Sequence, residues 1–228
     1  LFIDPLADSR YPRGRSENWR GDGILTYIHD ADRAERLRRS VIPTVEMFAY
    51  RTDDKLPLVA HDDQAVGRMA AEHLLERHFR RFAYSGYTGQ VWRDQRRLGF
   101  EDEVIRAGCS QPAALCVRRP GTLAEWEAVQ QELTDWILAM PKPMALMACS
   151  DHHAQRVLDA CRRAGVVVPE EVAVIGVDND EEICRLSTPP LTSVVLDSER
   201  VGYESARLLD ALMRKSLKPA RAASALIT

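Results

Sequence analysis

The sequence predicts an α/β fold in which parallel β-sheets are covered by helices. Short apolar runs alternate with longer amphipathic segments along almost the whole chain, and this alternation is typical of βαβ units. The 228 residues, 45% hydrophobic and 29% charged, suffice for one large domain or two small lobes. The expected strands are more numerous than one sheet of this size needs. The sequence pattern alone is therefore compatible with a fold of one lobe and with a fold of two lobes.

The strands are expected where short apolar or β-branched runs stand between charged residues, Gly or Pro. In chain order these runs are residues 1–3, 23–28, 43–48, 57–60, 81–86, 113–117, 144–148 and 172–177. Their length of a few residues and their nearly continuous apolar character favour buried parallel strands over helices.

The helices are expected where apolar residues recur every three or four positions. In the segment 64–77, Val66, Ala70 and Leu74 show this spacing, with charged residues on the other faces. The segment 93–107 ends at Gly108, a common helix terminator. The expected helices are residues 31–39, 64–77, 93–107, 122–140, 151–163 and 200–215.

Charge and cysteine content limit the function classes. The net charge of −3 argues against a chain that binds nucleic acid by itself, because such binding needs many cations. No apolar run approaches a membrane span and no secretory leader opens the chain. Five scattered cysteines without a C-x-x-C pair favour free thiols in a reducing cytoplasm. Because the chain starts without Met inside an expected strand, we expect it to be part of a longer protein.

Motifs of enzymes and nucleotide-binding proteins are missing from the sequence. There is no G-x-x-x-x-G-K-[ST] loop, no G-x-G-x-x-G after a strand and no G-x-S-x-G turn. We therefore expect no enzymatic activity and no cofactor.

Polar residues that suit a sugar follow several of the expected strands. Acidic residues come after three of the apolar strands, namely Asp62 with Asp63, Asp151 and Asp178. Arg93 and Arg96 open the helix after the strand 81–86, with Trp92 just before them. In such folds ligands bind beyond the carboxyl ends of the strands. Carboxylates accept hydrogen bonds from sugar hydroxyls, a guanidinium donates them, and an indole covers the apolar face of a sugar ring.

Helix capping and metal binding are alternative roles for these acidic residues, and both stay open. An Asp after a strand is also a common N-cap of the next helix. The run Asp-His-His at 151–153, with His-Asp-Asp at 61–63, could instead hold a metal ion, since both residue types bind Mn or Zn. A metal-dependent phosphoesterase using Asp62, Asp63, Asp151 and His152 is thus an alternative.

A series of short motifs also follows one another between residues 21 and 212. They are Asp62-Asp63-Gln64-Ala65, His73-Leu74-Leu75, Arg80-Arg81-Phe82-Ala83-Tyr84, Arg96-Arg97-Leu98-Gly99-Phe100, Ser150-Asp151, Val174-Ile175-Gly176-Val177-Asp178-Asn179 and Leu191-Thr192-Ser193-Val194. In content and order they resemble the effector domain of the lactose/galactose-repressor family, with Asp63 where that family usually has Asn.

This resemblance implies two Rossmann-like lobes of the type I periplasmic-binding-protein fold, closing on a monosaccharide. Lobe 1 would comprise residues 1–79 and 197–214, and lobe 2 residues 80–196. Residues 215–228 would lead towards a DNA-binding domain outside this chain, and the family's first strand and helix would precede Leu1. The family's sugar-binding positions fall on Arg96, Asp151 and Asp178, with Trp92 as a stacking wall and Asp62 as a contact at the rim of lobe 1.

Within the family, three motifs are similar to a xylose-responsive branch whose sensing domain is followed by an AraC-type DNA-binding domain. These motifs are residues 19–24, 92–96 and 175–179. The resemblance implies a cytoplasmic transcription regulator that binds D-xylose or another pentose, pairs as a homodimer and reads operator DNA through its other domain. A periplasmic sugar-binding protein with the same fold remains the alternative.

Overall fold

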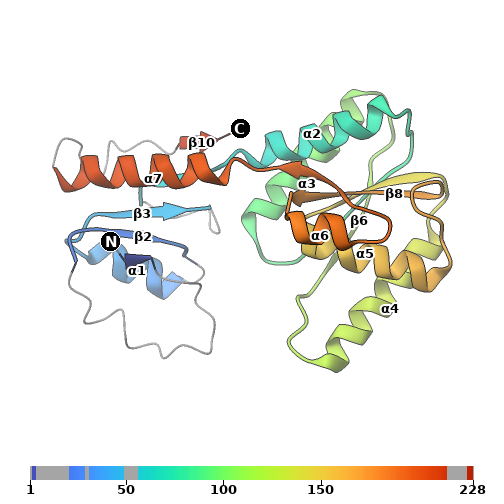
Figure 1. The fold of residues 1–228 in the computed structure, drawn as a ribbon, viewed down its shortest axis with the longest axis horizontal. Coiled ribbons are helices and arrows are strands. Elements are labelled where there is room, and N and C mark those ends of the chain that lie inside the picture. The colour runs from blue at the N-terminus through green and yellow to red at the C-terminus, as the bar shows by residue number, and fades with distance from the viewer. Residues whose placement is uncertain (1, 4–20, 29–30, 49–55, 215–224, 228) are drawn as a thin grey trace. The chain divides into compact units, whose positions relative to one another are not determined.

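The computed structural model of the chain describes residues 2–3, 21–28, 31–48, 56–214 and 225–227 (Figure 1). They belong to two compact units, the first made of Leu1–Asp62 and Asp197–Thr228 and the second of Asp63–Leu196. Both are α/β units whose described strands are all parallel. The described helices include none long and apolar enough to cross a membrane.

Unit 1 is built on one parallel sheet with the strand order β1-β2-β3-β4-β10. Its elements are β1 (Phe2–Ile3), β2 (Ile24–Thr26), α1 (Ala31–Arg39), β3 (Thr44–Met47), β4 (Leu58–His61), α7 (Ser198–Met213) and β10 (Ala225–Ile227). The core of the unit joins the sheet to α7, where Val201, Leu209 and Leu212 pack against strand residues such as Val45 and Val59.

Unit 2 has a second parallel sheet with the strand order β6-β5-β7-β8-β9. Its strands are β5 (Phe82–Tyr87), β6 (Ala113–Val117), β7 (Met144–Ala148), β8 (Val172–Asp178) and β9 (Thr192–Val195). Its helices are α2 (Asp63–Glu76), α3 (Val91–Arg106), α4 (Leu123–Ala139), α5 (Asp151–Ala164) and α6 (Glu181–Leu186).

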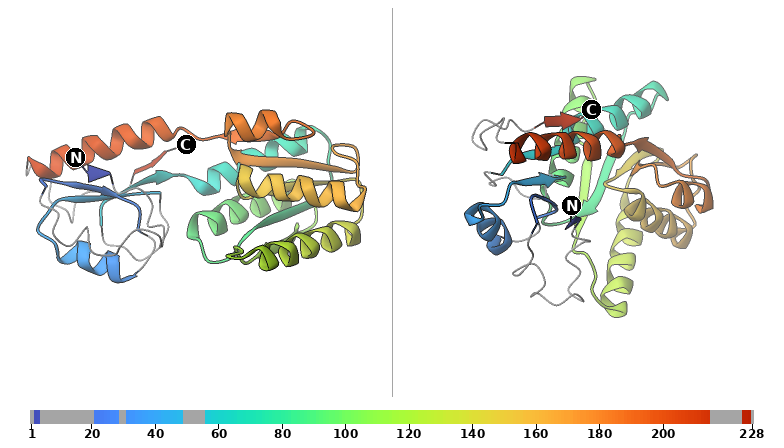
Figure 2. Two further views of the ribbon diagram at one scale, coloured as in Figure 1. Left: turned by 60° about the horizontal axis from the view of Figure 1, so that its bottom comes forward. Right: turned by 60° about the vertical axis from the view of Figure 1, so that its left-hand side comes forward.

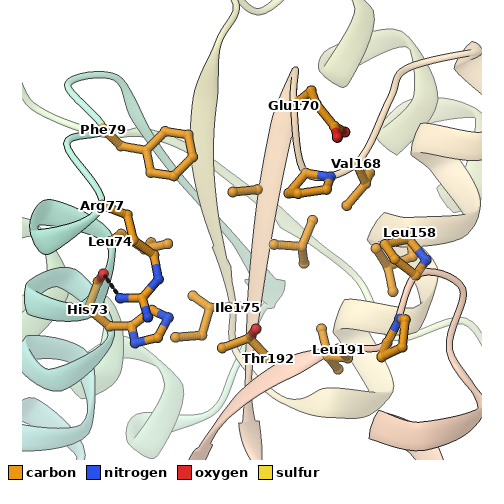
Figure 3. A pocket seen from close by; sticks show the side chains of 15 residues that line it. His73, Leu74, Arg77, Phe79, Leu158, Val168, Glu170, Ile175, Leu191 and Thr192 are labelled. Atoms are coloured by element: carbon orange, nitrogen blue, oxygen red, sulfur yellow. Dashed lines mark hydrogen bonds between the residues drawn. The ribbon is translucent and has the colours of Figure 1, made fainter.

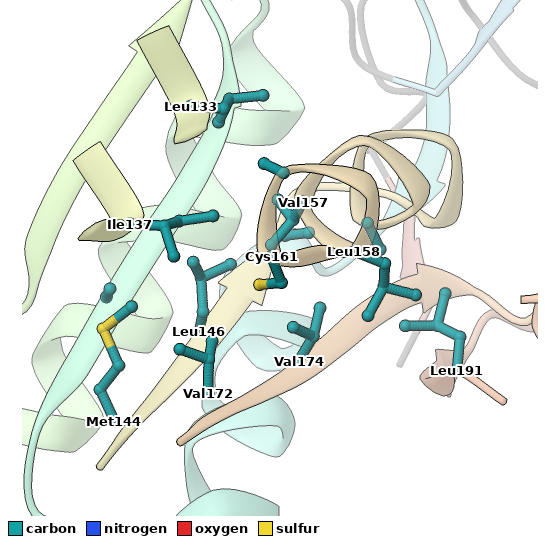
Figure 4. Close-up of a cluster of buried hydrophobic side chains, with 14 of the residues drawn as sticks. Leu133, Ile137, Met144, Leu146, Val157, Leu158, Cys161, Val172, Val174 and Leu191 are labelled. Atoms are coloured by element: carbon teal, nitrogen blue, oxygen red, sulfur yellow. The ribbon is translucent and has the colours of Figure 1, made fainter. Parts of the chain in front are cut away.

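Helices cover both faces of the unit 2 sheet (Figure 2). On one face, Leu133 and Ile137 of α4 and Val157 and Cys161 of α5 pack on strand side chains such as Leu146 (Figure 4). On the other face α2 and α3 bury a second cluster that includes strand side chains of β5, β7 and β8. Because β7 and β8 are buried on both sides, they are nearly continuous apolar runs in the sequence.

Helices α2 and α3 lie close to each other, and Gly67 and Gly99 allow this approach. A Cβ at Gly67 would stand 2.0 Å from the backbone oxygen of Arg96, and one at Gly99 would stand 2.0 Å from that of Gln64. This packing fixes α2 within unit 2, so the units divide at Asp62 and not at the residue 79 expected from the sequence. The division at residue 197 coincides with the expected one.

The structure also contains elements that the sequence did not predict. Strands β9 and β10 are too short to show a periodic pattern, and α6 has only six residues. Strand β10 pairs with β4 in unit 1, so part of the expected 215–228 tail belongs to the sheet. The motif at residues 19–24 lies only partly within the described residues, because residues 19 and 20 fall outside them.

Candidate functional site

The carboxyl ends of β5 and β7 form the point in unit 2 where the strand order reverses. Strand β5 lies between β6 and β7 in the sheet. The chain leaves β5 through α3, which covers one face, and reaches β7 through α4, which covers the other. In open parallel sheets a ligand crevice forms at such a reversal. Helices α3 and α5 both begin there and bring Trp92, Arg96 and Asp151 to this end of the sheet.

Arg96 is the central charged residue of this end of the sheet, and only 5% of it is exposed. Its Nε–H donates to Asp63 Oδ1 at 2.8 Å, and Nη1 donates to the Cys149 carbonyl at 2.7 Å and lies 3.5 Å from Asp178 Oδ1. Burial disfavours the charged guanidinium, but the Asp63 and Asp178 carboxylates outweigh it and raise the pKa of Arg96. The guanidinium therefore stays positively charged, and its hydrogen bonds hold it in place.

The indole of Trp92 lies next to this cation. The guanidinium carbon of Arg96 stands 4.6 Å from the centre of the Trp92 ring, a cation–π distance. The indole N–H is buried without a hydrogen-bond partner. Trp92 thus lies beside Arg96 with its ring against the guanidinium, and its predicted stacking on a sugar stays a prediction.

Asp178, at the end of β8, is the exposed carboxyl group of the cluster. Its side chain is 42% exposed, and its backbone has a φ of 112°, a conformation that L-residues rarely adopt. The next residue, Asn179, has a φ of 52°. Desolvation raises the pKa of Asp178 to about 6, with Asp151 adding to the shift and Arg96 opposing it. Backbone strain of this kind gathers at binding sites, where neighbouring contacts hold it.

Asp151 is buried, with 1% of its surface exposed, and both of its oxygens accept hydrogen bonds from the protein. Oδ1 accepts from the Ser193 hydroxyl at 2.7 Å, and Oδ2 accepts from the Asp180 N–H at 2.8 Å and from Cys184 Sγ at 3.5 Å. Burial raises the pKa of Asp151 despite these hydrogen bonds. Gly176 lets the carboxylate approach β8, because a Cβ there would stand 2.2 Å from Oδ1.

Helix capping is not the role of Asp151 or Asp178. The cap of α5 is Ser150, whose hydroxyl accepts from the His153 N–H, and the cap of α6 is Asp180, which accepts from the Ile183 N–H. Asp151 follows one cap, and Asp178 lies two residues before the other. The capping alternative is therefore wrong for both aspartates.

Four of the five predicted site residues, Trp92, Arg96, Asp151 and Asp178, lie in unit 2. Trp92 and Asp178 both lie beside Arg96, and the Asp151 carboxylate lies against Gly176 of β8. Asp62 is the last residue of the first segment of unit 1, where its N–H donates to the Ile227 carbonyl at 2.8 Å. Its predicted sugar contact stays a prediction.

The pairing of Asp63 with Arg96 and the role of Ser193 are features of the site that the sequence alone did not reveal. In the sequence Asp63 is one of the acidic residues after a strand, a departure from the family's usual Asn and part of the metal alternative. The structure shows that it is the buried partner of Arg96. Ser193 is visible in the sequence only as part of a motif. Both pairs join residues more than thirty positions apart, so no local signal in the sequence could reveal them.

A buried pair of polar side chains joins β5 to α5 near the site. Ser85 Oγ and His153 Nε2 are 2.8 Å apart, and both residues are completely buried. Burial, together with the charges of Arg156 and Arg93, lowers the pKa of His153 to about 3. The imidazole is therefore neutral at ordinary pH and contributes to the packing between β5 and α5.

The metal alternative finds no support in the described part of the chain. No group of three or more His, Cys, Asp and Glu side chains there could hold a metal ion. Asp63 is engaged by Arg96, and His152 is exposed at the start of α5.

A separate cavity of about 490 Å³ lies at the other end of β8 (Figure 3). Its walls come from the end of α2, the loop before β8 and the prolines before β9, and include His73, Phe79, Val168 and Leu191. Arg77 donates to the His73 carbonyl at 2.7 Å beside it. Because residues at the start of β8 line it and Asp178 does not, this cavity is distinct from the site around Arg96.

Two parallel α/β units with polar side chains at the reversal of strand order define a periplasmic-binding-protein-like fold. The sequence of residues 71–228 matches the family described as periplasmic binding protein-like domain, and the chain belongs to this family. The fold class expected from the sequence is thereby confirmed, and the two lobes implied by the resemblance are present as two units.

The relatives of the chain are named as transcription regulators. The xylose operon regulatory protein of Haemophilus influenzae is 32% identical over 84% of this chain and 51% of its own length. That of Escherichia coli K12 is 29% identical over 96% of this chain and 57% of its own length. The chain thus spans about half the length of these relatives. Their names agree with the expectation of a regulator and not an enzyme.

The solved structures that resemble this chain also include transcription regulators. The xylose-binding transcription activator xylR is 27% identical with a TM-score of 0.75, covering 92% of this chain and 56% of that one. A complex of the transcriptional regulator CelR with cellobiose is 26% identical with a TM-score of 0.76, covering 94% of this chain and 65% of that one. The resemblance to the lactose/galactose-repressor family and its xylose-responsive branch is therefore confirmed.

Proposed function

We propose that the chain is the sugar-sensing domain of a transcription regulator and that its ligand is a pentose, with D-xylose the first choice. One observation carries the proposal: the buried Arg96 guanidinium lies beside both the Asp178 carboxylate and the Trp92 ring at the carboxyl ends of the unit 2 strands. A guanidinium and a carboxylate side by side supply both a donor and an acceptor, which is what a vicinal pair of sugar hydroxyls needs. The names of the relatives support xylose as that sugar.

In this proposal Arg96 and Asp178 bind hydroxyl groups of the sugar, and Asp62 supplies a further carboxylate from unit 1. The ligand would favour one arrangement of the two units by the difference in its affinity for the two arrangements. We propose that this change is passed to an AraC-type DNA-binding domain outside the chain, in a cytoplasmic homodimer. The motifs shared with the xylose-responsive branch support these assignments.

The test is isothermal titration of the protein, in its full-length form, with D-xylose, L-arabinose, D-ribose, D-glucose and cellobiose. We expect saturable binding of one pentose, and D-xylose to bind more tightly than D-ribose or cellobiose. Asp178→Ala should weaken binding by about tenfold or more, because a sugar hydroxyl loses a charged acceptor.

The matched control is Asp135→Ala on α4, an exposed aspartate that accepts a hydrogen bond from Gln131 at 2.8 Å and lies outside the site. Its affinity should equal that of the wild type. Binding heat with cellobiose and with none of the other sugars would show that the ligand is a disaccharide and not a pentose. No heat with any of these sugars would overturn the proposed function.

A further inference from the structure

The turn between β8 and α6 presents Asp178 in a conformation that needs support from outside the turn. Asp178 and Asn179 both have positive φ angles, 112° and 52°. Asn tolerates such angles, but an Asp with a φ of 112° has an unfavourable backbone. The contacts that hold this turn therefore decide where the Asp178 carboxylate points.

Two side chains from other elements provide those contacts. The Asp180 N–H donates to Asp151 Oδ2 at 2.8 Å, and the Asn179 N–H donates to Ser193 Oγ at 3.0 Å. The Ser193 hydroxyl donates in turn to Asp151 Oδ1 at 2.7 Å. The two residues that follow Asp178 are thus tied to a single pair made of Asp151 and Ser193, anchored at the start of α5 and on β9.

These two side chains have little capacity left for a ligand. The Ser193 hydroxyl uses its one proton on Asp151 and accepts from Asn179. Each oxygen of Asp151 accepts at least one protein hydrogen bond, and the residue is 1% exposed, whereas the Asp178 side chain is 42% exposed. Gly176 completes the arrangement, since any side chain there would displace the Asp151 carboxylate.

We propose that Asp151 and Ser193 are positioning residues, which hold the strained β8–α6 turn and so place Asp178 for the sugar without touching the sugar themselves. This inference rests on the proposed function, in which Asp178 contacts the ligand. It gives Asp151 a different role from the direct contact that the family resemblance implies.

The two positioning residues differ in charge, and this difference separates their effects. The groups whose charges act on Asp178 are Arg96, which lowers its pKa, Asp151, which raises it, and His152, which lowers it. Asp151→Asn removes one of these charges, whereas Ser193→Ala removes none. A merely structural change would not shift the pKa of Asp178 in Asp151→Asn and leave this pKa unchanged in Ser193→Ala.

The first measurement needs no ligand. The titration of the Asp178 carboxyl is followed by carbon NMR in the wild type, Asp151→Asn and Ser193→Ala, with amide hydrogen exchange at Asn179 and Asp180. We expect the midpoint to fall in Asp151→Asn, and faster exchange of the Asn179 amide in Ser193→Ala. An unchanged midpoint in Asp151→Asn, or unchanged exchange in Ser193→Ala, would overturn the positioning role.

The second measurement is a double-mutant cycle on D-xylose affinity. Ser193→Ala should weaken binding by about tenfold in the wild type, but by no more than about twofold in the Asp178→Ala background, because the effect acts through Asp178. Equal losses in both backgrounds would show that Ser193 touches the sugar and would overturn the inference. Ser193→Thr, which keeps the hydroxyl, should restore most of the affinity.

The matched control is Ser187→Ala, which removes a hydroxyl that donates to the Ile183 carbonyl at the other end of α6. It should leave both the affinity and the titration unchanged. Urea unfolding of every variant separates loss of the fold from loss of position. A wild type that binds none of the sugars would refute the proposed function, while the ligand-free NMR data would still decide whether Asp151 and Ser193 hold the turn.

Discussion

The buried ion pair between Arg96 and Asp63 gives the sharpest prediction about stability. Asp63→Ala removes the carboxylate that accepts from Arg96 Nε at 2.8 Å and leaves the guanidinium of a residue that is only 5% exposed. We expect the mutation to destabilise unit 2 strongly, because a buried charge loses its principal partner.

The remaining contacts of Arg96 set the size of this loss. Removing one partner of a buried ion pair costs about 3–5 kcal/mol. Arg96 keeps its hydrogen bond to the Cys149 carbonyl and its attraction to Asp178 at 3.5 Å, so the lower end, about 3 kcal/mol, is expected. Asp63→Asn keeps an acceptor for the Nε–H and should cost about 1–2 kcal/mol.

Urea unfolding followed by tryptophan fluorescence measures this loss, because Trp92, Trp126 and Trp136 all lie in unit 2. Glu181→Ala is the matched control: it breaks the Glu181–Arg185 pair of α6, whose side chains are 78% and 77% exposed. An exposed pair contributes little, so the control should change the free energy of unfolding by less than about 1 kcal/mol. A loss in Asp63→Ala no larger than in this control would refute the reasoning.

Further predictions test the packing of α2 on α3, the site and the core. Gly67→Ala and Gly99→Ala should each destabilise unit 2 by about 1–3 kcal/mol or more in urea unfolding, since the added Cβ would stand 2.0 Å from a backbone oxygen. Gly202→Ala on α7 is the control: its added Cβ would meet nothing within 4 Å, so the change should be neutral or stabilising. D-xylose affinity measured by titration calorimetry should fall by about tenfold per pH unit below the Asp178 pKa of about 6, because only the carboxylate accepts two hydroxyl groups, and Asp178→Asn should remove this dependence. Without ligand, the raised pKa of Asp178 should make the protein more stable as the pH falls from 6 towards 4, since the folded carboxyl takes up its proton first; a flat urea midpoint over this range would contradict it. Burial raises the pKa of Cys149 to about 11, so this thiol should stay unmodified by Ellman's reagent at pH 8 until the protein unfolds.

The buried parallel strands and long helices were predictable because their signal is local. A strand covered on both faces must be apolar throughout, so β7 and β8 stand out in the sequence. The helices α4 and α5 show their buried faces as apolar residues at helical spacing. By contrast, β9 and β10 have four and three residues, and only their partners β8 and β4 make them strands.

The site was predictable at the level of residue types and not of contacts. The position of Asp178 after an apolar run predicted a place at the ligand end of the sheet, and Asp178 is the last residue of β8. The pairing of Arg96 with Asp63 depends on the close approach of α2 and α3, which the sequence showed only as two separate glycines. For the same reason α2 could not be assigned to unit 2 before the packing was known.

The two carboxylates beside Arg96 also bear on which sugars the proposed site would accept. Asp63 neutralises the guanidinium and Asp178 leaves an excess of negative charge, with Asp151 behind it. A phosphorylated or oxidised sugar would bring its own negative charge to this surface and be repelled. Under the proposed function, the arrangement therefore favours a neutral sugar over a phosphorylated or oxidised derivative of it.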